Sequence, residues 1–329
     1  MSGLHGHFIQ QVKRFAGAVQ SGHPAAWLGM FLKAVGPPGR FLDRCVSGSP
    51  SEAGSKSESM PACVMIVSPP RSGSTLIYQA LTRAIPCVYL SNLHLVFPSF
   101  ASGWLMKRDR LGRNSGFDNF YGYTSSLSDV CEGNELVGEW FEGGPDHRRV
   151  REKFLCFIEK MRASETHPLI FKNVRNYTRI SILHQAVPEL VFLRIRRNTE
   201  QTVQSVVKAY HELGGFHPVP PALEGRVIGD PVEFAVRQIL EIEREIDAQK
   251  RAIDPSVWLE WTYENFCSDA WAKIEGLAEN YLKMDKARLR RDGLSEPLTA
   301  SRRPKVSEQE ARRITELLRK LEPNPSGES

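Results

Sequence analysis

The chain has 329 residues, of which 41% are hydrophobic and 25% are charged. That is enough apolar material to bury one large core and to leave an appendage besides. The formal net charge of +5 is too small to support nucleic-acid binding by bulk electrostatics, whereas a modest positive excess suits an anionic small molecule.

The first 45 residues predict a helical extension with two amphipathic helices. Apolar side chains recur at helical spacing in each, and neither run approaches the roughly 20 residues that cross a bilayer. We favour a helical pair packed on the main domain or on a partner, and peripheral membrane contact through residues 8–35 stays open. Residues 46–60 are rich in Ser and Gly and predict a flexible linker, which leaves 61–329 as the main domain. The apolar positions are Phe8, Val12, Phe15 and Val19, then Trp27, Phe31 and Val35.

Residues 63–81 predict a strand, a loop and a helix that together bind an anion. Residues 64–67 form a continuous apolar run typical of a buried strand, and Pro69 and Pro70 end it. A loop of small residues follows and leads into a helix, so backbone N–H groups and the positive end of a helix dipole meet there. The loop residues are Arg71, Ser72, Gly73, Ser74 and Thr75.

This loop differs from the nucleotide-triphosphate P-loop at two important positions. Ser68 replaces the first glycine of G-x-x-x-x-G-K-[ST], and Ser74 replaces the lysine that reaches the transferring phosphates. The cation comes earlier, as Arg71. The string Pro70–Leu76 instead resembles the 5′-phosphosulfate loop of sulfotransferases, whose donor is 3′-phosphoadenosine 5′-phosphosulfate (PAPS). The resemblance implies that residues 71–75 bind this donor.

The segment after the loop helix contains the candidates for a general base. Residues 87–90 predict a second short strand, and 98–134 predict an irregular aromatic and polar segment that forms either an acceptor pocket or a covering layer. Tyrosylprotein sulfotransferases use a glutamate at the end of this strand, and Asn92, which stands here, cannot accept a proton. We therefore place His94 first, because its ordinary pKa of about 6.5 suits the task, and Glu139 second.

A third strand at residues 169–173 ends in Lys172-Asn173. Several sulfotransferases carry a lysine at this strand end, where the amine reaches the bridging oxygen of the donor. The resemblance implies that role for Lys172, whereas a lysine that caps an exposed strand end is the alternative.

A fourth strand, residues 190–195, is followed by Arg196, Arg197 and Asn198 and then by a helix with Thr199 as the expected N-cap. In sulfotransferases an arginine at such a strand end and a serine eight residues later hold the 3′-phosphate of the donor. Arg197 and Ser205 have that spacing. Arg196 is the rival for the arginine role.

The remaining chain predicts a loop at residues 211–230 that could gate the site, a long helix from Asp230-Pro231 and a strand at 258–261. A late basic loop precedes a charged C-terminal helix. Many sulfotransferases close such a loop over the donor, so the resemblance makes three of its side chains further candidates for the 3′-phosphate. They are Arg302, Arg303 and Lys305.

The cysteines show no C-x-x-C pairing and no histidine partner at metal spacing. We interpret all six as reduced packing residues of a cytoplasmic protein, without a disulfide framework or structural zinc.

The resemblance covers about residues 61–310 and implies a P-loop-like three-layer α/β fold with a central, mainly parallel sheet. It predicts a PAPS-dependent sulfotransferase that needs no metal, moves a sulfuryl group to a hydroxyl or amine acceptor such as a carbohydrate or glycolipid, and releases adenosine 3′,5′-bisphosphate. The expected location is cytoplasmic, with membrane association left open. Two alternatives remain: a magnesium-dependent P-loop kinase or NTPase, and a PAPS-binding protein of the same fold that has lost catalysis.

Overall fold

The computed structural model describes residues 16–17, 20–47, 60–108, 117, 119–161, 163, 167–294, 297–300 and 305–321. The sheet that these residues form has five parallel strands in the order β2-β3-β1-β4-β5. The central strand pairs with β3 on one side and β4 on the other, with Val64 opposite Ile170 and Val191. The strands are β1 (Cys63–Val67), β2 (Val88–Tyr89), β3 (Leu169–Lys172), β4 (Val191–Arg196) and β5 (Trp258–Thr262).

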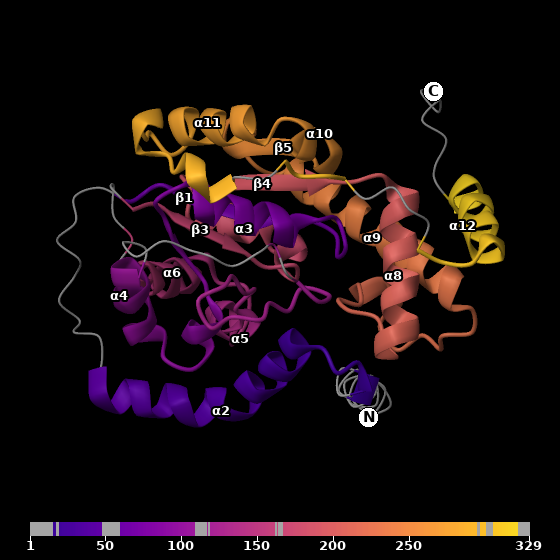
Figure 1. Cartoon of the computed structure of the whole chain (residues 1–329), viewed down its shortest axis with the longest axis horizontal. Coiled ribbons are helices and arrows are strands. Elements are labelled where there is room, and N and C mark those ends of the chain that lie inside the picture. The colour runs from indigo at the N-terminus through magenta and orange to yellow at the C-terminus, as the bar shows by residue number, and fades with distance from the viewer. Residues whose placement is uncertain are drawn as a thin grey trace.

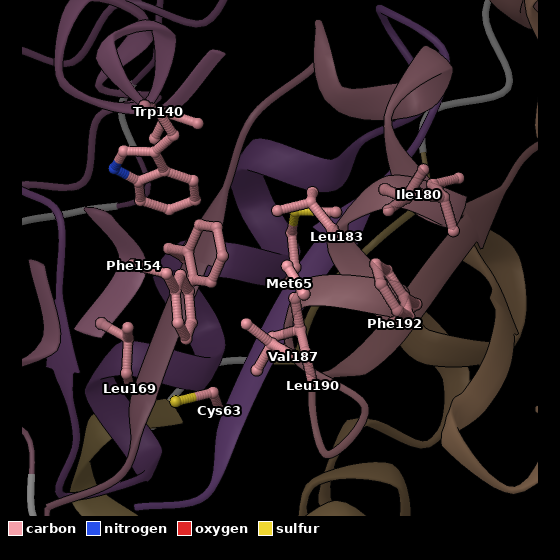
Figure 2. Packing of buried hydrophobic residues seen from close by; sticks show 14 of the residues in the cluster. Cys63, Met65, Trp140, Phe154, Leu169, Ile180, Leu183, Val187, Leu190 and Phe192 are labelled. Carbon is pink, nitrogen blue, oxygen red and sulfur yellow. The ribbon is translucent and has the colours of Figure 1, made fainter. Parts of the chain in front are cut away.

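Helices cover both faces of the sheet, because alternate residues of each strand point to opposite sides. Met65 packs with α6 (His147–Met161), α7 (Ile180–Ala186) and part of α9 (Pro231–Lys250) in one core cluster. Figure 2 shows Met65 close to Leu183 and Val187 in this cluster. Its neighbours in β1, Val64 and Ile66, pack instead with α3 (Ser74–Ala84), α10 (Tyr263–Ser268) and α11 (Ala270–Asn280). The result is a three-layer α/β fold, as predicted.

A third cluster joins α8 (Thr199–Leu213), α9 and α12 (Glu308–Leu321) at one end of the molecule (Figure 1). At another edge lies α2 (Pro24–Ser47), which contacts α4 (Pro98–Arg108) and η1 (Asn92–Leu95). The remaining elements are short. They are α5 (Asn134–Gly138), η3 (Glu139–Phe141), η4 (Asn176–Thr178), η5 (Pro221–Leu223), η6 (Pro255–Val257), η7 (Lys286–Arg288) and η8 (Arg291–Leu294).

Within the described part of the chain, no helix is both long enough and apolar enough to cross a membrane. Of the two helices predicted in the extension, the second corresponds to α2, and most of the first lies outside the described residues. The predicted linker at 46–60 also lies largely outside them.

Two local predictions were wrong. The segment 98–134 was expected to be irregular, yet its first residues form α4, where Ala101 and Leu105 supply only a short buried stripe. The N-cap of α8 is Asn198 rather than Thr199, because the Asn198 side chain accepts a hydrogen bond from the N–H of Gln201 at 3.0 Å. Every predicted strand is present.

Candidate active site

The loop after β1 ends at the uncapped N-terminus of α3. Gly73 precedes the helix in a left-handed conformation, no side chain caps the first turn, and that turn holds no acidic residue. The free N–H groups and the helix dipole therefore favour an anion at this point. Ser68 braces the loop from the strand end, since its hydroxyl donates to Ser74 Oγ at 2.8 Å.

Two backbone positions in the loop have positive φ angles, Arg71 at 66° and Gly73 at 85°. A Cβ atom added at Gly73 would lie 2.2 Å from Cδ2 of Tyr263, the first residue of α10. Glycine is therefore required at this position both for its conformation and for the space that Tyr263 occupies.

The two predicted donor motifs meet at this loop. Arg71 Nε donates a hydrogen bond to Ser205 Oγ at 3.1 Å, and Arg197 Nη1 donates to the Arg71 carbonyl at 3.3 Å. The Arg197 guanidinium also lies over the Tyr263 ring, 4.6 Å from its centroid. Because β1 and β4 are adjacent parallel strands, segments that follow them share one edge of the sheet. Arg196 is the exposed final residue of β4.

Lys305 lies close enough to Arg71 and Arg197 for their positive charges to affect its pKa. Its backbone N–H donates to Gln204 Oε1 of α8 at 3.4 Å. Burial lowers the pKa of Lys305, and the positive charges of Arg197, Arg71 and Lys208 lower it further, to about 8. Several cations thus surround a partly buried position, as an anion site requires. The predicted Arg302 and Arg303 lie outside the described residues.

Ser72 adds a further sign that the loop is shaped for a ligand. Ser72 is 1% exposed, and its hydroxyl oxygen has no hydrogen-bond partner within the described structure. A buried hydroxyl normally has such a partner. An anion seated on the N-terminus of α3 could supply it, so the residues present fit a phosphosulfate group.

A second group of polar residues lies where β3 ends. Lys172 is 3% exposed, forms an ion pair with Glu132 and donates to Thr75 Oγ1 at 3.4 Å. Asn173 holds the backbone of Glu132 in place, because Asn173 Nδ2 donates a hydrogen bond to the Glu132 carbonyl oxygen at 3.1 Å. A lysine, a hydroxyl at the start of α3 and a carboxylate therefore meet beside the loop.

His94 is not part of that group. Its side chain lies in η1 with 0% exposure, between two serine hydroxyls. The Ser91 backbone N–H donates to Nδ1 at 3.1 Å, so the ring proton is on Nε2, which is 3.0 Å from Ser102 Oγ. Burial lowers the pKa of His94 to about 3. Such a histidine is neutral, and its basic nitrogen is already engaged.

Glu139 is partly buried at the start of η3, next to Trp140 of the core. Trp140 packs against Phe154, Phe157 and Phe171. The carboxylate that contacts Lys172 belongs to Glu132, seven residues earlier.

The model of the sulfotransferase family matches residues 61–281, which is more than half of the chain. The protein belongs to the sulfotransferase family. The match includes β1 to β5, the loop after β1 and the Lys172 group.

Two solved bacterial sulfotransferases have the same fold. The sulfotransferase STF1 from Mycobacterium tuberculosis is 11% identical, with 94% of this chain and 90% of that chain covered and a TM-score of 0.54. The sulfotransferase STF9 from Mycobacterium avium is 14% identical, with 81% of this chain and 78% of that chain covered and a TM-score of 0.51. No curated protein matches the sequence.

In this sulfotransferase the sequence motifs did not reveal Glu132. It follows Val130 and Cys131 in a segment without periodicity. The mixture of aromatic and polar residues there pointed only to an acceptor pocket or a covering layer and singled out no residue. Tyr121 comes from the same segment, and the Arg71 guanidinium lies 4.7 Å from its ring centroid. Among the described residues, no group of three or more His, Cys, Asp or Glu side chains is arranged to hold a metal ion.

Proposed function

We propose that this sulfotransferase takes a sulfuryl group from PAPS and transfers it to a hydroxyl or amine of a carbohydrate or glycolipid acceptor. The observation that carries the proposal is the convergence of Arg71, Arg197 and Lys305 beside the uncapped N-terminus of α3, with a lowered Lys305 pKa. A donor with two separate anionic groups suits this arrangement, since an ordinary 5′-nucleotide would leave part of the positive charge without a partner.

Donor binding divides between the two motifs. Residues 71–75 and the first N–H groups of α3 hold the 5′-phosphosulfate, and the Ser72 hydroxyl donates to one of its oxygens. Arg197, Ser205 and Lys305 hold the 3′-phosphate. The hydrogen bond from Arg71 to Ser205 connects the two halves of the site. A planar, permanently charged guanidinium suits such paired anions.

In the transfer step a lone pair of the acceptor oxygen or nitrogen forms a bond to sulfur. The bond between sulfur and the bridging oxygen breaks, and adenosine 3′,5′-bisphosphate leaves with that electron pair. Lys172, which contacts Thr75 at the start of α3, neutralises the charge that develops on the bridging oxygen. Arg71 and the loop N–H groups neutralise the sulfuryl oxygens.

Glu132 is the group that we assign to accept the proton of the acceptor. It is a carboxylate with 20% of its side chain exposed, held against Lys172 and reachable from solvent. His94, our first expectation, is fully buried and its basic nitrogen already accepts a hydrogen bond. Glu139 is the second candidate. In this assignment His94 is a packing residue that orders η1.

The test is a transfer assay of the full chain with sulfur-radiolabelled PAPS against fractionated carbohydrates and lipids, with and without excess EDTA. We expect labelled product at an unchanged rate in EDTA, because the cations of the protein replace a metal at the transferring group. Arg71→Ala should lower the rate by about 10² or more, whereas the exposed Arg196→Ala should leave it close to wild type. Complete loss in EDTA that magnesium restores would support a kinase-like enzyme instead.

A further inference from the structure

Helix α2 packs on the body of the protein through its small residues. Ala25 and Ala26 are buried, and so are Gly36 and Gly39 further along the helix. A Cβ atom at Gly39 would lie 2.3 Å from Cγ1 of Val96. Leu32, which is 2% exposed, is the large apolar residue on this face, and at Gly39 the helix lies too close to the body for any side chain.

Four other large apolar residues of α2 lie on the opposite, outer face. Trp27 is 51% exposed, Phe31 61%, Phe41 66% and Leu42 56%. Their spacing places them along one stripe of the helix. Only two other large hydrophobic residues of the described chain are more than half exposed, Val227 at 93% and Phe100 at 60%, and Phe100 belongs to α4, which contacts α2. In Figure 1, α2 lies along the outer edge of the molecule, away from α11.

The charges of α2 are almost all positive. Its sequence holds Lys33, Arg40 and Arg44 and one acidic residue, Asp43. Asp43 is 6% exposed and accepts a hydrogen bond from the N–H of Ser99 at 3.0 Å, so it does not face outward. Lys33 is exposed. Arg40 is half-buried and its Nη1 donates to the Leu95 carbonyl at 2.8 Å, whereas the exposed Lys33 donates to Tyr123 Oη at 3.3 Å. The outer face of α2 is therefore aromatic with an exposed lysine at its edge, and none of its described exposed residues is acidic.

From this arrangement we propose that α2 docks the protein on the surface of an anionic lipid bilayer. The helix would lie in the interfacial plane, with Trp27, Phe31 and Phe41 among the headgroups and acyl chains and the exposed Lys33 beside lipid phosphates. A second copy is a poorer occupant, because a two-fold contact would bring the same basic helix against it. An anionic bilayer supplies the complementary charge.

A short series of aromatic contacts connects this helix to the donor loop. His23, directly before α2, stacks on Phe120 with ring centroids 4.5 Å apart. The Phe120 ring lies 4.8 Å from that of Tyr121, which is in cation–π contact with Arg71. A docked α2 would thus place the site near acceptors carried by lipids. That consequence depends on the proposed sulfuryl transfer, whereas the docking does not.

The test is flotation of the full chain with vesicles of phosphatidylcholine alone or mixed with phosphatidylglycerol, without PAPS. We expect binding to the mixed vesicles that weakens with added salt. The double variant Phe31→Ser, Phe41→Ser should bind at least about tenfold more weakly, since each aromatic ring loses its apolar burial. The control is Val227→Ser, which removes an apolar side chain that is 93% exposed and lies outside α2, on the loop before α9.

Both variants should keep the wild-type melting temperature and bisphosphate affinity, because the altered side chains are exposed. Absence of vesicle binding, or equal binding by the double variant, would overturn the proposal. So would a concentration-dependent dimer that the double variant abolishes, since this face would then be an interface between copies. Vesicle binding without any sulfuryl transfer would contradict the proposed function alone.

Discussion

At the level of single residues, the proposed donor loop depends on Gly73. Its φ of +85° and the nearby Tyr263 ring together exclude a side chain. The Arg197 guanidinium lies over the same Tyr263 ring, so a displaced Tyr263 would also displace the cation expected to bind the 3′-phosphate.

Gly73→Ala should therefore weaken bisphosphate binding by at least about tenfold, through a left-handed strain of roughly 1–2 kcal/mol and the shift of Tyr263. Isothermal titration measures the change. Gly225→Ala is the matched control, because Gly225 has a φ of +75° with no atom within 4 Å of an added Cβ. Equal affinities for the Gly73→Ala variant and the wild type would show that the loop does not hold the donor.

The second prediction at this scale concerns the proton acceptor. Glu132→Gln keeps the shape of the side chain but removes its ability to take a proton, so turnover should fall by roughly 10²–10⁴. Bisphosphate affinity should change little, because Glu132 contacts Lys172 rather than the arginines. Glu139→Gln is the comparison. If it alone abolishes turnover while Glu132→Gln remains active, the base is Glu139.

At the level of elements, the segment before α12 brings Lys305 to the proposed donor site. Ile314, Leu317 and Leu318 anchor α12 in the cluster with α8 and α9, and the Lys305 N–H bonds to Gln204 of α8. The pKa of Lys305, about 8, lies below its ordinary 10.5. Between these values the unfolded chain holds a proton that the folded chain lacks. This group therefore makes the protein more stable as the pH rises from about 8 towards 10.5.

Binding of the bisphosphate should show the opposite dependence on pH. Below pH 8 Lys305 is charged and ready for an anion, whereas above it the free protein must first take up a proton. The dissociation constant should therefore rise above pH 8, by up to about tenfold per pH unit. Lys305→Gln should flatten this profile. Lys208→Gln, at a lysine paired with Glu212, should keep the dependence and move its midpoint to a slightly higher pH, because the Lys208 charge lowers the pKa of Lys305. A wild-type affinity that stays constant from pH 7 to about pH 10 would place Lys305 outside the site.

Elements with strong local signals were predictable from the sequence. Continuous apolar runs identified the strands, and the prolines and glycine after β1 identified the loop. The outward face of α2 was not predictable, because periodicity shows that a helix is amphipathic but not which neighbours it meets. Here Gly36 and Gly39 let the helix backbone approach Leu95 and Val96 closely, so the face with the glycines packs on the body and the aromatic side chains point outward.

The site was predictable only where its residues follow strands. Arg71 lies in the loop that follows β1, Lys172 is the last residue of β3, and Arg197 directly follows β4. Parallel strands bring such positions together. Glu132 comes from a segment without periodicity, and its position depends on long-range contacts such as the hydrogen bond from Asn173. The burial of His94 likewise depends on Ser102 of α4, a helix that the sequence did not reveal.

At the level of the whole molecule, the proposed donor site joins parts of the chain that are far apart in sequence. The loop after β1, the start of α8, α10 and the segment before α12 all contribute to it. A ligand that binds all four parts favours the folded state over the unfolded one, so its binding should appear as a gain in global stability.

The central claim is tested most directly by thermal unfolding of the full chain with adenosine 3′,5′-bisphosphate and, separately, with AMP. At a concentration 100-fold above its dissociation constant the bisphosphate should stabilise the protein by about 2.7 kcal/mol, and AMP at the same concentration should stabilise it far less. Arg197→Ala should remove most of this difference, whereas Arg196→Ala should retain it. A melting temperature that the bisphosphate leaves unchanged, or that AMP raises equally, would contradict the account.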